Sequence, residues 1–314
     1  MTYMQEHYPH SSDSRPLRTQ RPILIPPPTK QKHQNLETIL LRMGSVLVAF
    51  SAGVDSAFLA DAARRVLGDG ALAVTGRSPS LPESELVEAR RVAERIGIRL
   101  LEINTRELAD PRYAANSADR CFFCKEELFR RLVSIADREG IAYVADGTIP
   151  DDLSDERPGR AAGRAYGVRS PLLEADLTKA EIRVLSKARG LPTWDKPAMA
   201  CLASRIPRGQ RVTAEKLRTV ERAEAHLREL GFRQLRVRHH GALARIEVEA
   251  GEVPRFFEPG MMDAVSHAFQ RIGFPKVSVD LKGYRTGGLN GQPADRPGSI
   301  PLPVISAPVF PHER

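Results

Sequence analysis

The segment that decides the fold is Ser45-Val-Leu-Val-Ala-Phe-Ser-Ala-Gly-Val-Asp-Ser56. Its first half is an apolar run after Gly44, which is typical of a buried parallel strand. Its second half is a turn of serine and glycine, and a helical pattern follows from Ser56 to Leu67. A buried strand, a glycine turn and a helix in this order predict the first unit of a parallel α/β sheet.

The same alternation continues along the chain and predicts a doubly wound parallel sheet over residues 35–207. We expect the remaining strands and helices of this domain at residues 71–75, 82–96, 98–103, 125–138, 141–145 and 176–189. After Pro207 the order changes to helix, strand, strand, helix and strand. This order predicts a smaller C-terminal α+β domain over residues 208–285, which we expect to bind substrate or form subunit contacts.

Composition excludes several classes of protein. Half of the 24 prolines lie in two polar tails, and we expect residues 1–34 and 286–314 to be disordered. No apolar run approaches the roughly 18–20 residues of a membrane span, and the N-terminus lacks the apolar core of a signal peptide. Three cysteines are too few for a disulfide framework. These features predict a soluble, cytoplasmic protein without a membrane partner.

The net charge of +8 is unevenly distributed. Residues 201–285 contain 16 Lys and Arg residues against 10 Asp and Glu residues. This local excess predicts an anionic partner for the C-terminal part. Only 6% of the residues are aromatic and Trp194 is the one tryptophan, which argues against nucleic acid, because stacking platforms need such side chains.

The turn after the first strand is a candidate phosphate site. A helix N-terminus offers unpaired N–H groups and a partial positive charge to an anion. Gly53 lets the backbone approach an oxyanion, and Ser51 and Ser56 add hydroxyl donors. Asp55 would hold Mg²⁺ or cap the helix. An ordinary strand-to-helix turn capped by serines is the alternative that the local sequence leaves open.

All three cysteines lie in segments that resemble motifs. Cys121 and Cys124 form a Cys-x-x-Cys pair at the expected start of a helix, and Cys201 lies far along the chain. Such a pair suits a metal ion, a disulfide or an iron–sulfur cluster. Structural zinc prefers four ligands, whereas three thiolates suit a 4Fe–4S cluster with one open iron. For Cys201 alone, a small buried apolar side chain is the alternative.

The order of the motifs resembles a known family. The turn is similar to the Ser-Gly-Gly-x-Asp-Ser loop of the PP-loop ATP pyrophosphatases, which have an adenine nucleotide alpha hydrolase-like fold, with Ala52 at the first glycine position. With the later segments, the chain from residue 35 to 287 resembles the LarE family of ATP-dependent sulfur transferases. The motifs that carry this resemblance are Ser51-Ala-Gly-Val-Asp-Ser56, Cys121-Phe-Phe-Cys-Lys125, Asp155-Glu-Arg-Pro-Gly159, Gly167-Val-Arg-Ser-Pro-Leu-Leu-Glu174, Cys201-Leu-Ala-Ser-Arg-Ile-Pro207, Arg236-Val-Arg-His-His240, Ala244-Arg-Ile-Glu247 and Asp280-Leu-Lys-Gly-Tyr-Arg-Thr286.

The resemblance implies a two-step reaction in the synthesis of the nickel-pincer nucleotide cofactor of lactate racemase. ATP, bound at residues 51–56 including Val54, would adenylate a carboxylate of an anionic pyridinium mononucleotide and release pyrophosphate. A sulfur nucleophile would then displace AMP and leave a thiocarboxylate. In one branch of the family a single cysteine, here Cys201, is sacrificed and becomes dehydroalanine. In another branch three cysteines hold a 4Fe–4S cluster with an extra sulfide, and the presence of Cys121 and Cys124 favours that branch.

The resemblance also implies the substrate residues and a homo-oligomer. Ser204 and Arg205 follow Cys201 closely enough to bind the nucleotide phosphate or AMP. Glu224 matches a family acid near the substrate or metal site. Arg236 and Arg238 share a face if they lie on a strand and would bind the phosphate or carboxylate of the substrate, and the family match is better for Arg236. Solvated charge on a strand or helix surface is the alternative for Arg236, Arg238 and Glu224. A charged loop with Asp152, Asp155, Arg157 and Gly159 is assigned a structural, subunit-contact or catalytic role.

Two other functions compete with this interpretation. A tRNA thiolase of the same superfamily would also combine the phosphate loop with a three-cysteine cluster. A non-catalytic regulator would bind the nucleotide without cleaving it.

Overall fold

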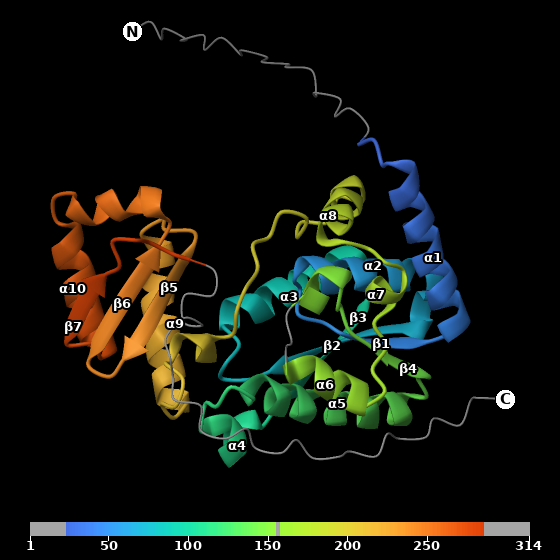
Figure 1. Ribbon diagram of the computed structural model, residues 1–314, viewed down its shortest axis with the longest axis horizontal. Helices are drawn as coiled ribbons and strands as arrows, with labels where there is room; N and C mark the ends of the chain where they lie inside the picture. Colours follow the sequence, from blue (N-terminus) through green and yellow to red (C-terminus); the bar gives the residue numbers. More distant parts are fainter. Residues whose placement is uncertain (1–22, 155–157, 286–314) are drawn as a thin grey trace, which may run out of the picture.

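The computed structural model describes residues 23–154 and 158–285 and confirms the parallel α/β sheet (Figure 1). Four strands lie in the order β3-β2-β1-β4, and every neighbouring pair is parallel. The strands are β1 (Val46–Ala49), β2 (Ala71–Arg77), β3 (Arg99–Asn104) and β4 (Tyr143–Ala145). Because the strands are parallel, the segments that follow them meet at one edge of the sheet, where ligands bind in this architecture.

Helices cover both faces of this sheet (Figure 1). One face carries α1 (Pro27–Met43), α2 (Val54–Leu67), α3 (Glu83–Ile96), α7 (Pro171–Glu174) and α8 (Lys179–Ala188), and the other carries α5 (Arg120–Glu139) and α6 (Pro158–Ala165). The central strand divides its side chains accordingly. Val46 and Val48 pack into the core under α1 and α2, whereas Leu47 packs into the core under α5. In the described part of the chain, no helix is long and apolar enough to cross a membrane.

The first helix, α1, has no counterpart in the sequence prediction and begins inside the expected tail. Residues 27–34, which the proline content assigns to a disordered tail, form the first turns of α1. The fixed φ of proline suits the first position of a helix, where its missing N–H costs nothing. Leu36 and Leu40 then anchor the helix in the core. Residues 1–22 and 286–314 lie outside the described residues, as do Asp155 and Arg157 of the charged loop.

A separate three-stranded sheet lies at the C-terminal end of the described chain, as predicted (Figure 1). Its strand order is β5-β6-β7, with an antiparallel first pair and a parallel second pair. Its elements are α9 (Ala214–Glu229), β5 (Leu235–His240), β6 (Leu243–Val248), α10 (Met261–Ile272) and β7 (Lys276–Val279). The charged face of β5 and β6 carries Arg236, Arg238, Arg245 and Glu247, because these residues pair with one another in register.

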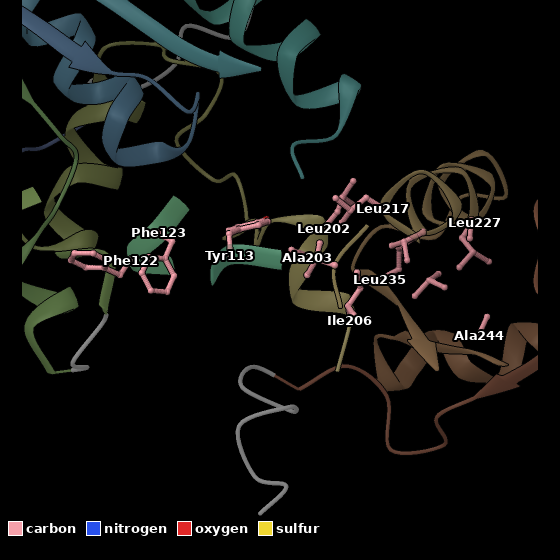
Figure 2. Packing of buried hydrophobic residues seen from close by; sticks show 14 of the residues in the cluster. Tyr113, Phe122, Phe123, Leu202, Ala203, Ile206, Leu217, Leu227, Leu235 and Ala244 are labelled. Carbon is pink, nitrogen blue, oxygen red and sulfur yellow. The ribbon is translucent and has the colours of Figure 1, made fainter. Parts of the chain in front are cut away.

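One hydrophobic core joins the two sheets (Figure 2). It runs from Phe122 and Phe123 on α5, through Tyr113 and Leu202, to Leu235 on β5. Leu202 belongs to a short 3-10 helix, η4 (Leu202–Arg205), in the connection between the sheets. This connection is therefore packed as part of a core, and the division into domains at residue 207 stays a prediction.

Candidate functional site

The loop between β1 and α2 has the left-handed backbone that a glycine would favour. Ala52 has φ of 52° and is completely buried. An L-residue in this conformation costs about 1–2 kcal/mol. Alanine can adopt it because its side chain is only a methyl group. The next residue, Gly53, returns to an extended conformation and is the N-cap of α2. The loop therefore keeps the turn that presents the N-terminus of α2, although alanine stands at the glycine position.

Two hydrogen bonds within the loop and a close contact with a neighbouring backbone segment stabilise its conformation. The hydroxyl oxygens of Ser51 and Ser56 are 3.0 Å apart, and the Ser51 N–H donates to Ser56 Oγ over 3.2 Å. On the other side, a Cβ atom built on Gly147 would lie 3.0 Å from the Ser56 nitrogen. Gly147 follows β4, so only a residue without a side chain lets this neighbouring segment pass so close to the loop.

Asp55 faces Lys179 across the loop. The Lys179 ammonium, at the first position of α8, donates to Asp55 Oδ2. Asp55 Oδ1 is buried and has no hydrogen-bond partner among the described residues. Burial raises the pKa of Asp55, and the bond from Lys179 opposes this shift. An unpaired carboxylate oxygen beside a phosphate-type loop fits Mg²⁺, which takes oxygen ligands from one or two carboxylates and from phosphates.

A second ammonium group contacts the loop. Lys196 Nζ donates to the carbonyl of Ala52 over 3.2 Å and to Glu85 Oε2 over 2.8 Å. Lys179 and Lys196 therefore add positive charge beside the N-terminus of α2, where the phosphates of ATP would lie. Our sequence analysis missed both lysines. Lys179 lies at the start of the helix expected over residues 176–189, where Thr178 is the N-cap.

Two distant segments carry the three cysteines to one place. Cys121 and Cys124 lie in the first turn of α5, and Cys201 immediately precedes η4. All three are thiols, with Cys121 and Cys201 exposed and Cys124 half-buried. Burial above all, then the charges of Glu107 and Cys201, raise the pKa of Cys124 to about 12. The sulfur atoms are thus near enough for their charges to act on one another.

Asn116 and Arg120 tie the two cysteine segments together. The buried Asn116 amide donates to the carbonyls of Ile206, Pro207 and Gln210 over 3.2, 2.8 and 3.0 Å. Arg120 donates to Asn116 Oδ1 and, over 2.9 Å, to the carbonyl of Ala203. Burial opposes the charge of Arg120, but the thiolates of Cys201 and Cys121 raise its pKa. This junction, which our sequence analysis missed, fixes η4 against the start of α5.

The donor set suits a cluster better than a single metal ion. Over residues 23–154 and 158–285, no group of three or more His, Cys, Asp or Glu side chains is arranged to hold one ion. A 4Fe–4S cluster is a larger body whose cysteine ligands lie farther apart, and it is held by thiolates alone. Three cysteine ligands would leave one iron of such a cluster without a protein ligand. The cluster itself stays a proposal.

A buried carboxylate, that of Glu107, lies near Cys124. Glu107 is 2% exposed and accepts hydrogen bonds from the hydroxyls of Ser78 and, over 3.0 Å, Ser80. The carbonyl of Ser80 accepts from the Leu202 N–H over 2.9 Å, which connects these serines to the residue after Cys201. Tyr113 lies in the same region, and burial first, then the thiolates of Cys201 and Cys124, raise its pKa. None of these groups belongs to a motif that the sequence analysis identified.

Arg205 and Glu224 lie inside the protein and face each other. Arg205 Nε and Nη2 donate to the two Glu224 carboxylate oxygens over 2.7 and 3.0 Å. Arg205 Nη1 donates to the carbonyls of Ala200 and Cys201 over 2.5 and 3.0 Å and to Ser204 Oγ over 3.0 Å. These contacts support a positioning role for Arg205, since its donors hold the Cys201 segment. Direct substrate contacts of Arg205, Ser204 and Glu224 stay predictions.

Arg236 and Arg238 lie on one face of β5 and differ in their partners. Arg238 donates to Glu247 Oε2 over 2.8 and 3.0 Å and to the Ser204 carbonyl over 3.0 Å. Arg236 has no carboxylate partner in the described part of the chain and instead donates to the carbonyls of Leu235 and Ala198. Burial, then the charge of Arg205, lower the pKa of Arg236. A buried guanidinium without a counter-ion favours an anionic ligand.

Comparisons with known proteins cover most of the chain. No family model matches it. An uncharacterized protein of Synechocystis sp. is 44% identical over 261 residues, which are 83% of this chain and 97% of that protein. The pyridinium-3,5-bisthiocarboxylic acid mononucleotide synthase of Lactiplantibacillus plantarum is 36% identical over 260 residues, 82% of this chain and 94% of the synthase. The chain belongs to the LarE family of sulfur transferases.

The LarE assignment agrees with the fold. The match to the synthase covers most of both proteins, so it includes the parallel sheet and the small C-terminal sheet. A shorter match, 29% identical over 163 residues, is to a component of the glutamine-hydrolyzing GMP synthase of Methanococcus maripaludis. It covers 46% of this chain and 50% of that protein. The parallel sheet with its loop after β1 is the PP-loop architecture expected of a LarE protein.

Proposed function

We propose that this LarE-family chain is an ATP-dependent sulfur transferase that converts a carboxylate of a pyridinium mononucleotide into a thiocarboxylate. The observation that carries the proposal is one segment, residues 196–205. At Lys196 it contacts the loop after β1, and at Ala198 and Ala200 its carbonyls accept bonds from Arg236 and Arg205. Cys201 lies within this segment. The segment that carries Cys201 is therefore bonded to a phosphate-type loop at one point and to arginines at others, which supports a sulfur-transfer role for Cys201.

The first step is adenylation. A substrate carboxylate oxygen attacks the α-phosphorus of ATP, and the bond from that phosphorus to the bridging oxygen breaks to release pyrophosphate. The N–H groups of α2, the serine hydroxyls, Lys179 and Lys196 stabilise the charge that develops on the phosphates. Asp55 would hold Mg²⁺, which supplies further positive charge to the phosphate oxygens when bound.

The second step is sulfur transfer. A sulfur nucleophile attacks the carbonyl carbon of the adenylate, the carbon–oxygen bond breaks, and AMP leaves with the electron pair. Arg236 and Arg238 orient the anionic nucleotide, since guanidinium groups bind phosphate and carboxylate in fixed geometry. Cys121, Cys124 and Cys201 would hold a 4Fe–4S cluster, which when bound supplies an extra sulfide as the nucleophile. In the alternative, the Cys201 sulfur displaces AMP and forms a thioester. A base then removes the Cα proton of Cys201, and the Cβ–S bond breaks with its electron pair on sulfur, which leaves the thiocarboxylate and dehydroalanine at position 201.

The test is a single turnover under anaerobic conditions with ATP, Mg²⁺ and a pyridinium-3,5-dicarboxylate mononucleotide. We expect pyrophosphate, AMP and the thiocarboxylate product. Asp55→Ala should abolish pyrophosphate release, whereas the exposed Asp69→Ala should keep it. Pyrophosphate release that survives in Asp55→Ala would rule out the loop assignment, and ATP binding without any release would indicate a regulator.

The same protein separates the two sulfur sources. Brown protein with about four irons per chain after anaerobic purification supports the cluster. Colourless, iron-free protein that turns over once, with Cys201 lighter by one H₂S in the mass spectrum, supports sacrifice instead. Co-purification of tRNA would favour a tRNA thiolase. The homo-oligomeric state stays a prediction from the family, and the cytoplasmic location stays a prediction from the composition.

A further inference from the structure

We propose that Tyr113 is a hydrogen-bond donor of the sulfur site, whose hydroxyl binds the sulfur atom that the three cysteines present for transfer. The inference rests on the proposed function and adds a residue to its second step. It applies to a cluster-bound sulfide and to a Cys201 sulfur alike, because both are acceptors that carry negative charge.

The position of Tyr113 is the first observation. Tyr113 belongs to α4 (Pro111–Ala114), and its ring lies between Phe123 of α5 and Leu202 of η4 (Figure 2). These two residues are the sequence neighbours of Cys124 and Cys201. The phenol therefore lies between the two segments that carry the thiols.

The unused hydroxyl is the second observation. Tyr113 is 1% exposed, and its oxygen has no hydrogen-bond partner within the described residues. Buried polar groups in native proteins are nearly always paired, so an exception points to a missing ligand or a functional role. A phenol is protonated at neutral pH, because its ordinary pKa is about 10, and it can therefore donate.

The neighbouring polar groups already have partners. Ser80 is near enough to affect the Tyr113 hydroxyl, but its own oxygen lies 2.6 Å from Ser78 Oγ and donates to Glu107 over 3.0 Å. The amide of Asn116 and the guanidinium of Arg120 are bonded to backbone carbonyls of the Cys201 segment. The hydroxyl of Tyr113 is thus a buried donor near the cysteine segments that has no hydrogen-bond partner in the described part of the chain, as is that of Ser117. Hydrogen bonds to sulfur stabilise negative charge on it and tune the properties of iron–sulfur centres.

The experiment compares Tyr113→Phe with a matched control, Tyr166→Phe, in the full chain. For the iron-free proteins we expect Tyr113→Phe to unfold at the same or a higher temperature than the wild type, because it removes an unpaired buried hydroxyl. A clear loss of stability, confined to Tyr113→Phe, would mean that the hydroxyl is bonded within the protein, for example to Ser80. That result would overturn the proposal.

The second readout follows sulfur directly. Iron-loaded proteins are given inorganic sulfide under anaerobic conditions, and the sulfide retained after desalting is measured over time. We expect Tyr113→Phe to lose it about 10- to 100-fold faster than the wild type and the control. In single turnovers, pyrophosphate release should be unchanged while thiocarboxylate formation falls by a similar factor. Equal retention in variant and wild type would overturn the proposal. Wild-type protein without pyrophosphate release would instead count against the proposed function, and the sulfide measurement would still decide the role of Tyr113.

Discussion

Arg205 and Glu224 are joined by two hydrogen bonds, and both side chains are fully excluded from solvent. Glu224 also accepts from the Val237 N–H over 3.1 Å and from Arg228 over 3.1 Å. The pair therefore connects the Cys201 segment, α9 and β5. A buried ion pair of this kind adds little compared with apolar residues, but loss of one partner leaves a buried charge uncompensated.

We expect Glu224→Ala to lower the free energy of unfolding by about 3–5 kcal/mol, because Arg205 remains buried without its counter-ion. The double variant Arg205→Met with Glu224→Leu should regain most of that loss. Glu229→Ala, at an exposed position of the same helix, should change stability by less than about 0.5 kcal/mol. Urea unfolding measures all three. Equal effects of Glu224→Ala and Glu229→Ala would contradict the buried pair.

Ala52 tests the cost of the left-handed turn. Ala52→Gly relieves about 1–2 kcal/mol of backbone strain but loses chain entropy and a buried methyl group, so stability should stay within about 1 kcal/mol. Ala52→Val adds a β-branched side chain at positive φ and should destabilise the loop and abolish pyrophosphate release. Thermal unfolding and a pyrophosphate assay check both variants. A fully active Ala52→Val enzyme is incompatible with the φ of 52°.

Asp55 predicts a pH dependence. Burial raises its pKa above the ordinary value of 3.8, so the folded state binds this proton more tightly than the unfolded chain. Stability then falls as the pH rises from 3.8 through the folded pKa, and Asp55→Asn removes this loss. At pH values above that interval, Asp55→Asn should unfold at a higher temperature than the wild type. At pH values below it, the two unfolding temperatures should be closer together. Thermal unfolding across pH tests this, with Asp69→Asn as the exposed control. A disadvantage of Asp55→Asn that grows with pH would refute the sign.

Replacement of Asn116 should lower the free energy of unfolding for two reasons, the loss of its hydrogen bonds and the strain of its left-handed backbone. Its amide donates to three backbone carbonyls that follow η4, those of Ile206, Pro207 and Gln210, and its φ is 59°. Asn116→Gly keeps the backbone conformation and should lose about 1–3 kcal/mol. Asn116→Ala adds the left-handed strain of about 1–2 kcal/mol. Denaturant unfolding compares both with the exposed Asn104→Ala. Variants that match Asn104→Ala would show that the junction contributes nothing to stability.

The thiols of the iron-free protein should react in a defined order. Burial, with the charges of Glu107 and Cys201, raises the pKa of Cys124 to about 12, so its reactive thiolate is scarce until the pH approaches that value. Cys121 and Cys201 are exposed. Iodoacetamide at about pH 8 should therefore modify those two first, as peptide mass spectrometry would record. Modification of Cys124 ahead of Cys201 would disagree with its burial.

Local pattern predicted most of the fold. The apolar run before the loop became β1, and the helix expected over residues 176–189 became α8. Helix α1 was not predicted, because prolines at the first turn of a helix resemble prolines in a disordered tail when only composition is considered. Neighbouring residues fix caps and strands, so the sequence reveals them directly.

The candidate site was only partly predictable. Motifs pointed to the loop and the cysteines, but Lys179 and Lys196 reach the loop from distant parts of the chain, 124 and 144 residues away along the sequence. Asn116 and Tyr113 lie in no motif and acquire their surroundings from α5 and η4. Such contacts depend on how the two sheets share a core, and a single sequence carries no local signal for them.

The connection between the sheets has a mechanical consequence. Cys201 is fixed to the small sheet through Arg205 and Glu224, and the bonds of Arg236 and Arg238 hold the same segment. The same stretch of chain is also bonded to α5 through Asn116 and Arg120, and to the loop after β1 through Lys196. It therefore fixes the small sheet, the cysteines and the phosphate-type loop in one arrangement. A nucleotide held by the arginines would then meet ATP and the sulfur at distances that both depend on this one connection.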